Sequence, residues 1–310
     1  GAPKAFFYRK SGSGWSEITG LIKDDNSVCT NVIQAVTADF NGDGKPDVYV
    51  VCGGIGVKQV FFMSQSSGYA RQESPFTLTD SWGAAAGDVD GDGDVDLVLT
   101  NNGLTYAYLN DGQKLGAASF GSSASAGRIP TAATGNVDFP TLHRKVFLLP
   151  RIGKGPDLVI GGDGASNNKT MILLKNDSGY FYANAASPTT YNSFAGYTLN
   201  NVVLKPFDLV ETSNFLYVLA KNTDVNSASS ATTLVVLRYE LPANNNPATS
   251  VINLTGPDGT NDANFVVFTQ TPAPSGGFVV QFKPANGKLV AYDGGCDTLP
   301  IRCAFSVTAP

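Results

Sequence analysis

Two acidic, glycine-rich segments that repeat along the chain constrain the fold more than any other feature. Residues 35–51 read AVTADFNGDGKPDVYVV and residues 84–100 read AAAGDVDGDGDVDLVLT, so they align without a gap at an offset of 49 residues. Each has a small apolar run, an Asp- and Gly-rich stretch, and a run of alternating or β-branched apolar residues. This order is typical of a strand, a turn and a second strand. The chain is therefore predicted to consist of repeated β-units.

Weaker copies of the unit continue toward the C-terminus. A strand similar to residues 47–51 returns at residues 96–100 and then at residues 157–160, 215–219 and 278–282, at intervals of 49 to 63 residues. Repeats of this length with about four strands each are typical of propeller blades. One such unit cannot bury both faces alone, whereas radial stacking covers the faces and ring closure protects the edges.

We therefore predict an all-β chain, a β-propeller of about five four-stranded blades in a single domain over residues 1–310. Six blades, or a fragment of a larger ring, remain open as alternatives. The predicted blades span residues 4–57, 58–104, 105–168, 169–231 and 232–295, with residues 296–310 as a C-terminal closing segment.

Composition and charge narrow the choice of partner. Charged residues make up only 15% of the chain and glycine is abundant, which favours short strands and polar turns over helices. The net charge is −5, but eight of the 26 acidic residues lie within residues 39–47 and 88–96. The sequence has no basic stripe, so we expect no nucleic acid partner. It also has no membrane-spanning run, so we expect no insertion into a membrane.

The two acidic segments have the spacing of a calcium loop. Calcium takes six to eight oxygen ligands at about 2.3–2.6 Å. Residues 1, 3 and 5 of such a loop point inward, glycines at positions 4 and 6 accept positive φ, position 7 offers its carbonyl, and a carboxylate at position 9 closes the shell. The predicted ligands are Asp39, Asn41, Asp43, Asp47 and the Lys45 carbonyl in the first loop, and Asp88, Asp90, Asp92, Asp96 and the Asp94 carbonyl in the second.

The alternatives to calcium are a plain acidic turn and a different cation. Asp and Gly are common in turns, but carboxylates packed within nine residues repel one another unless a cation neutralises them. Magnesium demands a stricter six-fold shell, and sodium is the other candidate. An EF-hand would carry Glu at position 12, where this chain has Val50 and Leu99 in apolar strand runs. We predict two calcium ions with a structural role, each in a strand-flanked loop.

The third unit keeps Pro156 and Asp157 but lacks the earlier acids. Arg151 and Lys154 stand near the position of the missing ion. We therefore expect a positively charged side chain to replace the metal there by pairing with Asp157.

Residues 82–97 closely resemble the FG-GAP or VCBS repeat of integrin-α-like propellers, and residues 38–51 are similar to the same repeat. Two units match strongly and three more match in outline. The resemblance implies a β-propeller used in binding or adhesion, because similar propellers include integrin heads, fungal and bacterial lectins, and surface adhesins.

The four cysteines predict disulfides rather than a zinc site. They form no CxxC pair, and the single histidine, His143, cannot complete a Cys/His set. The simplest pairing joins Cys29 to Cys52 and Cys296 to Cys303, although four cysteines allow three connectivities and buried free thiols are the alternative. Disulfides imply an extracellular protein, secreted or on a cell surface.

Three functions are open on the sequence. The first is a calcium-stabilised, lectin- or adhesin-like module that recognises glycans or a cell-surface protein, with loops at one end of the propeller or clefts between blades as the binding site. The second is a polysaccharide lyase or hydrolase on a propeller scaffold, and the third is a structural domain of a larger surface protein. We expect no enzyme, because neither a GxSxG nor an HExxH motif occurs and residues 143–145 read as an exposed basic turn. The sequence predicts no catalytic residue and does not locate a ligand-binding site or an oligomeric state.

Overall fold

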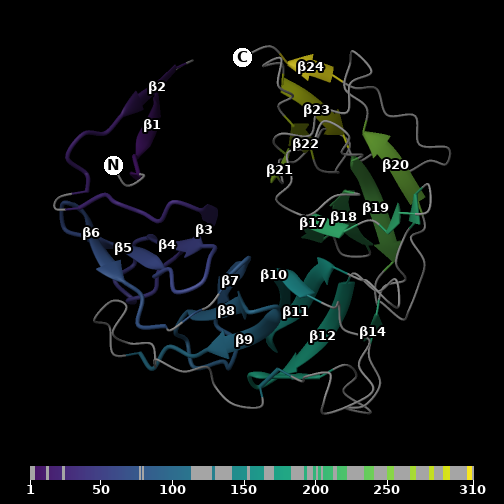
Figure 1. Cartoon of the computed structure of the whole chain (residues 1–310), viewed down its shortest axis with the longest axis horizontal. Helices are drawn as coiled ribbons and strands as arrows, with labels where there is room; N and C mark the ends of the chain where they lie inside the picture. Colours follow the sequence, from purple (N-terminus) through teal and green to yellow (C-terminus); the bar gives the residue numbers. More distant parts are fainter. Residues whose placement is uncertain are drawn as a thin grey trace. The chain divides into compact units, whose positions relative to one another are not determined.

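The computed structural model of the chain is all-β: each regular element among the described residues is a strand, and none of them is a helix (Figure 1). The structure describes residues 4–11, 14–22, 25–76, 78, 80–112, 128–129, 142–151, 154–163, 171–182, 192–193, 198–199, 202–203, 205–211, 215–221, 234–240, 250–254, 266–269, 279–282, 289–293 and 306–308.

The chain divides into two compact units. The first contains residues 1–162 and 172–192, and the second contains residues 163–171 and 193–310. The strands of the first unit are β1 (Tyr8–Ser11), β2 (Gly14–Glu17), β3 (Val32–Ala38), β4 (Asp47–Cys52), β5 (Val60–Gln65), β6 (Gly68–Glu73), β7 (Ala84–Gly87), β8 (Asp96–Asn101), β9 (Leu104–Tyr108), β10 (Leu142–Arg151), β11 (Lys154–Asp163), β12 (Met171–Asp177), β13 (Tyr180–Tyr182) and β14 (Asn192–Ser193).

These strands form sheets in which neighbours along the chain are neighbours in the sheet. The orders are β1-β2, β3-β4-β5-β6, β7-β8-β9 and β10-β11-β12-β13, with β14 also pairing with β12. The pairs in the second and third of these sheets are antiparallel. Such a meander is the strand order of a propeller blade.

The sheet β7-β8-β9 is covered on both faces. Leu97 and Leu99 of β8 belong to an apolar cluster that they share with Tyr49 and Phe61 of the preceding sheet. Val98, between them, belongs to a second cluster that reaches the sheet of β10 to β13. Because successive side chains of a strand point to opposite faces, β8 contributes to two cores at once. The sheets are therefore stacked face to face, as the sequence predicts for blades.

The first strands of neighbouring sheets also meet, β3 with β7 and β7 with β10. Gln34 of β3 connects the first two of these strands. Its side-chain Nε2 donates to the carbonyl of Ala84 over 2.9 Å, and the Ala84 amide donates to Gln34 Oε1 over 3.3 Å. The Gln34 side chain thus provides hydrogen bonds to the carbonyl and the amide of Ala84, which point away from the paired strand β8 toward the neighbouring sheet.

The second unit repeats the same four-stranded order. Its sheets are β17-β18-β19-β20 and β21-β22-β23-β24, with a separate hairpin β15-β16. Its strands are β15 (Thr198–Leu199), β16 (Val202–Val203), β17 (Lys205–Glu211), β18 (Phe215–Lys221), β19 (Leu234–Glu240), β20 (Ser250–Leu254), β21 (Val266–Thr269), β22 (Val279–Phe282), β23 (Leu289–Asp293) and β24 (Ser306–Thr308). Within this unit β17 lies beside β21, again first strand beside first strand.

The sheets divide the chain at other points than the predicted blade boundaries. The boundary predicted between residues 57 and 58 falls between β4 and β5, which pair within one sheet. The second predicted blade begins at residue 58, just before the conspicuous aromatic run of residues 60–63, and this run forms β5, the third strand of its sheet. The all-β class and the four-stranded unit are confirmed, and the number of blades stays a prediction.

The disulfide between Cys29 and Cys52 is confirmed, with the two Cα atoms 5.9 Å apart. It ties the segment before β3 to the end of β4. Cys296 and Cys303 lie outside the described residues. Among the described residues, no helix has the length and apolar character needed to cross a membrane.

The prediction that residues 143–145 form an exposed basic turn is wrong. They lie in β10, where His143 is 4% exposed and Lys145 is 9% exposed. Thr105 Oγ1 of β9 and His143 Nδ1 are hydrogen-bonded over 2.7 Å. Charge alone predicted a turn here, but the apolar residues that follow place the segment in a buried strand. Burial lowers the pKa of His143 from 6.5 to about 4.

We expect stability to depend on the protonation of His143. The unfolded chain takes up a proton on this imidazole at a higher pH than the folded chain does. The contribution of neutral His143 to the free energy of unfolding is therefore fully present above about pH 6.5. It is lost as the pH falls toward about 4, at a limiting slope of about 1.4 kcal/mol per pH unit. Urea unfolding of the wild type and of His143→Gln across this range measures the effect. Parallel pH profiles for the two proteins would contradict it.

Candidate metal centre

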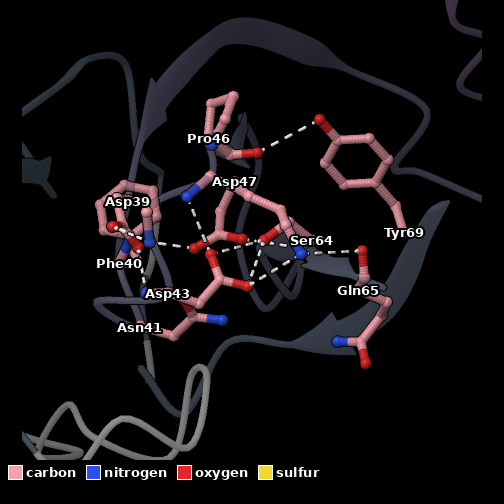
Figure 2. A network of polar contacts seen from close by, with 11 residues as sticks. Asp39, Phe40, Asn41, Asp43, Pro46, Asp47, Ser64, Gln65 and Tyr69 are labelled. Atoms are coloured by element: carbon pink, nitrogen blue, oxygen red, sulfur yellow. Dashed lines mark hydrogen bonds and ion pairs between the residues drawn. The ribbon is translucent and has the colours of Figure 1, made fainter. Parts of the chain in front are cut away.

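The first acidic loop, residues 39–47, connects β3 to β4 and is folded around its own carboxylates (Figure 2). Asp39 accepts the amides of Asp43 and Gly44 over 3.0 and 2.7 Å. The Asn41 side-chain oxygen also accepts the Asp43 amide, over 3.0 Å, and Asp43 Oδ1 accepts the Lys45 amide over 2.9 Å. Side chains at loop positions 1, 3 and 5 therefore bend the backbone around one point.

The second acidic loop, residues 88–96, connects β7 to β8 in the same way. Asp88 Oδ1 accepts the Gly91 amide over 2.7 Å, and Asp88 Oδ2 accepts the Gly93 amide over 3.1 Å. Asp92 Oδ1 accepts the Asp94 amide over 2.9 Å.

Two glycines in each loop have the backbone conformation that the spacing predicts. Gly91 and Gly93 have φ of 84° and 94°, and Gly42 and Gly44 have φ of 69° and 80°. A Cβ on Gly91 or Gly93 would meet nothing within 4 Å, so the backbone angle and not space requires glycine there.

A buried aspartate closes each loop at the start of the second strand. Asp47 and Asp96 are both 0% exposed. Asp47 Oδ2 accepts the Phe40 amide over 2.9 Å and Asp47 Oδ1 accepts the Ser64 amide over 2.6 Å. Asp96 repeats this pattern, with the Val89 and Asn110 amides each at 2.8 Å. Each carboxylate therefore joins its own loop to the third strand of the sheet or to the residues that follow it.

The third sheet has the same aspartate with a lysine in place of the loop. Asp157 is 3% exposed, and its Oδ1 accepts the Asn176 amide over 3.0 Å. Its Oδ2 accepts from Lys175 Nζ over 2.7 Å. The expected positive partner is therefore present, but it comes from β12. The side chains of Arg151 and Lys154, which the sequence analysis proposed for this role, lie outside those that the structure describes.

The electrostatics of the loops fit a bound cation. Burial, with smaller contributions from the neighbouring Asp90 and Asp92, raises the pKa of Asp96 to about 7. Burial also raises the pKa of Asp47 and of Asp90. Raised values mean that the fold penalises the ionised carboxylates, and a cation among them would remove that penalty.

Three carboxylates of the second loop converge. One oxygen each from Asp88, Asp90 and Asp96 lie within 4.8 Å of one another, and no other such group of acids, histidines or cysteines occurs among the described residues. Asp90 Oδ1 is buried and has no hydrogen-bond partner. Such an oxygen is costly unless something fills the gap, and a hard cation that takes oxygen ligands fits this donor set. In the first loop the position of Asp90 is taken by Asn41. This side chain is a neutral amide, so the first loop has no matching group of three carboxylates.

Each acidic loop also contacts the next sheet. Asn110 Nδ2 donates to the Phe40 carbonyl of the first loop over 2.8 Å, and Asn176 Nδ2 donates to the Val89 carbonyl of the second loop over the same distance. Phe40 and Val89 both occupy position 2 of their loops. The acidic loops are therefore part of the contacts between sheets.

The structure places the predicted site residues in two separate loops, and it adds partners that the sequence analysis missed. These partners are Ser64, Asn110, Asn176, Lys175 and, beside Asp90, Arg128. The available signal was the Asn-Asp pair that follows an apolar strand both at residues 110–111 and at residues 176–177. Pairing these asparagines with acidic loops about 70 and 87 residues away required the stacking of the sheets.

Comparison with known families agrees with the local geometry. Residues 39–99 match the model of the FG-GAP-like repeat. This span contains both acidic loops and the sheet strands between them. The resemblance noted on the sequence is therefore confirmed for these residues.

Comparison with whole proteins adds little. No curated protein matches the chain. Among solved structures, an endo-1,4-beta-xylanase from Bacteroides thetaiotaomicron VPI-5482 is similar at 10% identity, with a TM-score of 0.45, over 90% of this chain and 94% of that chain. A likeness at this level supports no conclusion about activity.

We expect Lys175→Met to destabilise the protein by about 2 kcal/mol, because Asp157 would remain buried without the cation it now binds. Lys58→Met is the matched control. It removes the Lys58–Glu73 pair, in which the two side chains are 64% and 51% exposed, and should have no measurable effect. Urea unfolding at pH 7 measures both variants, and equal losses would argue against a special role for Lys175.

Proposed function

We propose that this protein is an extracellular binding module whose two acidic loops each hold one structural calcium ion. The observation that carries the metal is the convergence of Asp88, Asp90 and Asp96 around the unpartnered Asp90 oxygen. Calcium is favoured because the surrounding donors are all oxygens and calcium accepts an irregular shell of six to eight of them, whereas magnesium demands an octahedral shell. Asp39, Asn41, Asp43 and Asp47 would supply the side-chain ligands of the first ion, and Asp88, Asp90, Asp92 and Asp96 those of the second. The carbonyls of Lys45 and Asp94 would complete the two sets.

A structural role follows from the way the loops are built. Most of their carboxylates also bind amides of the same loop, so the ion would fix a turn whose shape these hydrogen bonds already set. A catalytic metal would instead need a position open to water or substrate. Asp47 and Asp96 connect the loops to the rest of their sheets, so bound calcium would stabilise whole sheets.

The binding role rests on the FG-GAP-like repeat and on the stacked four-stranded sheets. Loops at the ends of stacked sheets are free to vary without disturbing the core, which suits recognition of a glycan or a cell-surface protein. The Cys29–Cys52 disulfide fits an oxidising, extracellular setting.

Calcium titration of chelator-treated protein should give two bound ions and a rise in melting temperature. Asp39→Asn should remove one ion and Asp88→Asn the other, because each replaces the first carboxylate of one loop. Asp177→Asn is the control, since it changes an exposed acid outside both loops and should leave two ions bound. Isothermal titration calorimetry gives the stoichiometry. If the wild type binds no calcium, the metal assignment is wrong.

A glycan array probed once with calcium and once with chelator tests the binding role. We expect glycan binding that depends on calcium, because loops at the sheet ends would lose their positions with the ions. A silent array with retained binding to whole cells would instead favour a cell-surface protein as partner. Turnover of an acidic polysaccharide would contradict a purely binding role.

A further inference from the structure

The second acidic loop lies against a cation of the protein itself, the guanidinium of Arg128. Arg128 Nη2 lies 3.7 Å from Asp90 Oδ2, and each of the two side chains is 17% exposed. The arginine belongs to the segment between β9 and β10, far from the loop in sequence. It approaches one oxygen of Asp90, while the other oxygen of that carboxylate is the buried one without a hydrogen-bond partner.

The β12–β13 turn holds Arg128 in this place. The Phe181 amide donates to the Arg128 carbonyl over 2.8 Å, and Arg128 Cζ lies 4.8 Å from the centroid of the Tyr180 ring. Gly179 packs so closely that an added Cβ would collide with Arg128 Nη1 and with Asp90 Cβ. A backbone hydrogen bond, a cation–π contact and a glycine thus fix the guanidinium beside the loop, so the pair is not a chance encounter of surface side chains.

The charge of the second loop explains the need for such a group. Residues 88–96 contain five aspartates, whereas residues 39–47 contain three. The cation of the first loop is Lys45, which lies 4.0 Å from Asp43 with its side chain 52% exposed, so water screens that pair strongly. The Arg128–Asp90 pair is mostly shielded from water and is correspondingly stronger.

We propose that Arg128 is a built-in counter-ion of the second acidic loop, which stabilises the loop without calcium and thereby lowers its calcium affinity. The effect on calcium affinity rests on the proposed function, since it requires that the loop binds calcium; the stabilisation of the loop does not. The third sheet offers a parallel, because there Lys175 pairs directly with Asp157. Electrostatics determine the direction of both effects. When calcium is absent, the guanidinium offsets repulsion among the carboxylates; when calcium binds, the two positive charges repel each other.

The test compares Arg128→Gln with Arg128→Lys in a background of Asp39→Asn, so that calcium titrates the second loop alone. Arg128→Gln removes the charge, whereas Arg128→Lys keeps the charge and alters the shape. For Arg128→Gln we expect a melting temperature in chelator several degrees below that of the background, and a calcium affinity about threefold to tenfold higher. Arg128→Lys should stay closer to the background in both measurements.

The outcomes separate the two proposals. Weaker calcium binding by Arg128→Gln would overturn the inference, because it would mean that Arg128 orients Asp90 for the ion. An unchanged melting temperature in chelator would overturn it as well. If the wild type itself binds no calcium, the proposed function fails. The counter-ion role is then decided by the melting temperatures alone, and Arg128→Gln must melt below Arg128→Lys for it to stand.

Discussion

The first three multi-stranded sheets depend on one buried carboxylate each, at or near the start of the second strand. Asp47, Asp96 and Asp157 are almost fully buried, and each accepts an amide hydrogen bond from a residue in or just after the third strand. A buried carboxylate is expensive unless its oxygens are satisfied. The remaining oxygen accepts a loop amide in the first two sheets, whereas in the third it accepts from the Lys175 ammonium of β12. The same buried aspartate thus occurs in two sheets with an acidic loop and in one sheet where a lysine pairs with it.

The other acids of the loops follow from this arrangement. Once Asp96 is buried, Asp90 and Asp92 lie close enough for their charges to oppose its ionisation. The chain relieves this repulsion with Arg128 on one side, and a metal ion would relieve it on the other. The convergent oxygens lie within the span of the family match at residues 39–99, and both observations support the proposed metal site.

Much of this was predictable from sequence because the repeat is local and its residues have unusual backbone needs. The glycines of both loops, the apolar run at residues 97–99 and the Cys29–Cys52 pair all express short-range constraints. The blade boundaries were harder to place, since an aromatic strand is conspicuous in sequence wherever it stands in its sheet. Arg128 and Lys175 could not be found at all, because a cation reaches its partner through stacking and pairing of strands that no spacing rule encodes. His143 was misplaced for a similar reason, since its basic neighbours indicated an exposed turn although the segment is a buried strand.

The asparagine contacts between sheets have a direction. Asn110 reaches back to the loop of the preceding sheet, and Asn176 does the same one sheet further along. Each loop is thus held from the C-terminal side, by a sheet that is synthesised after it. During synthesis the first acidic loop would lack this hydrogen bond until the next sheet has folded. Folding of each of these sheets would therefore complete the contacts of the sheet before it.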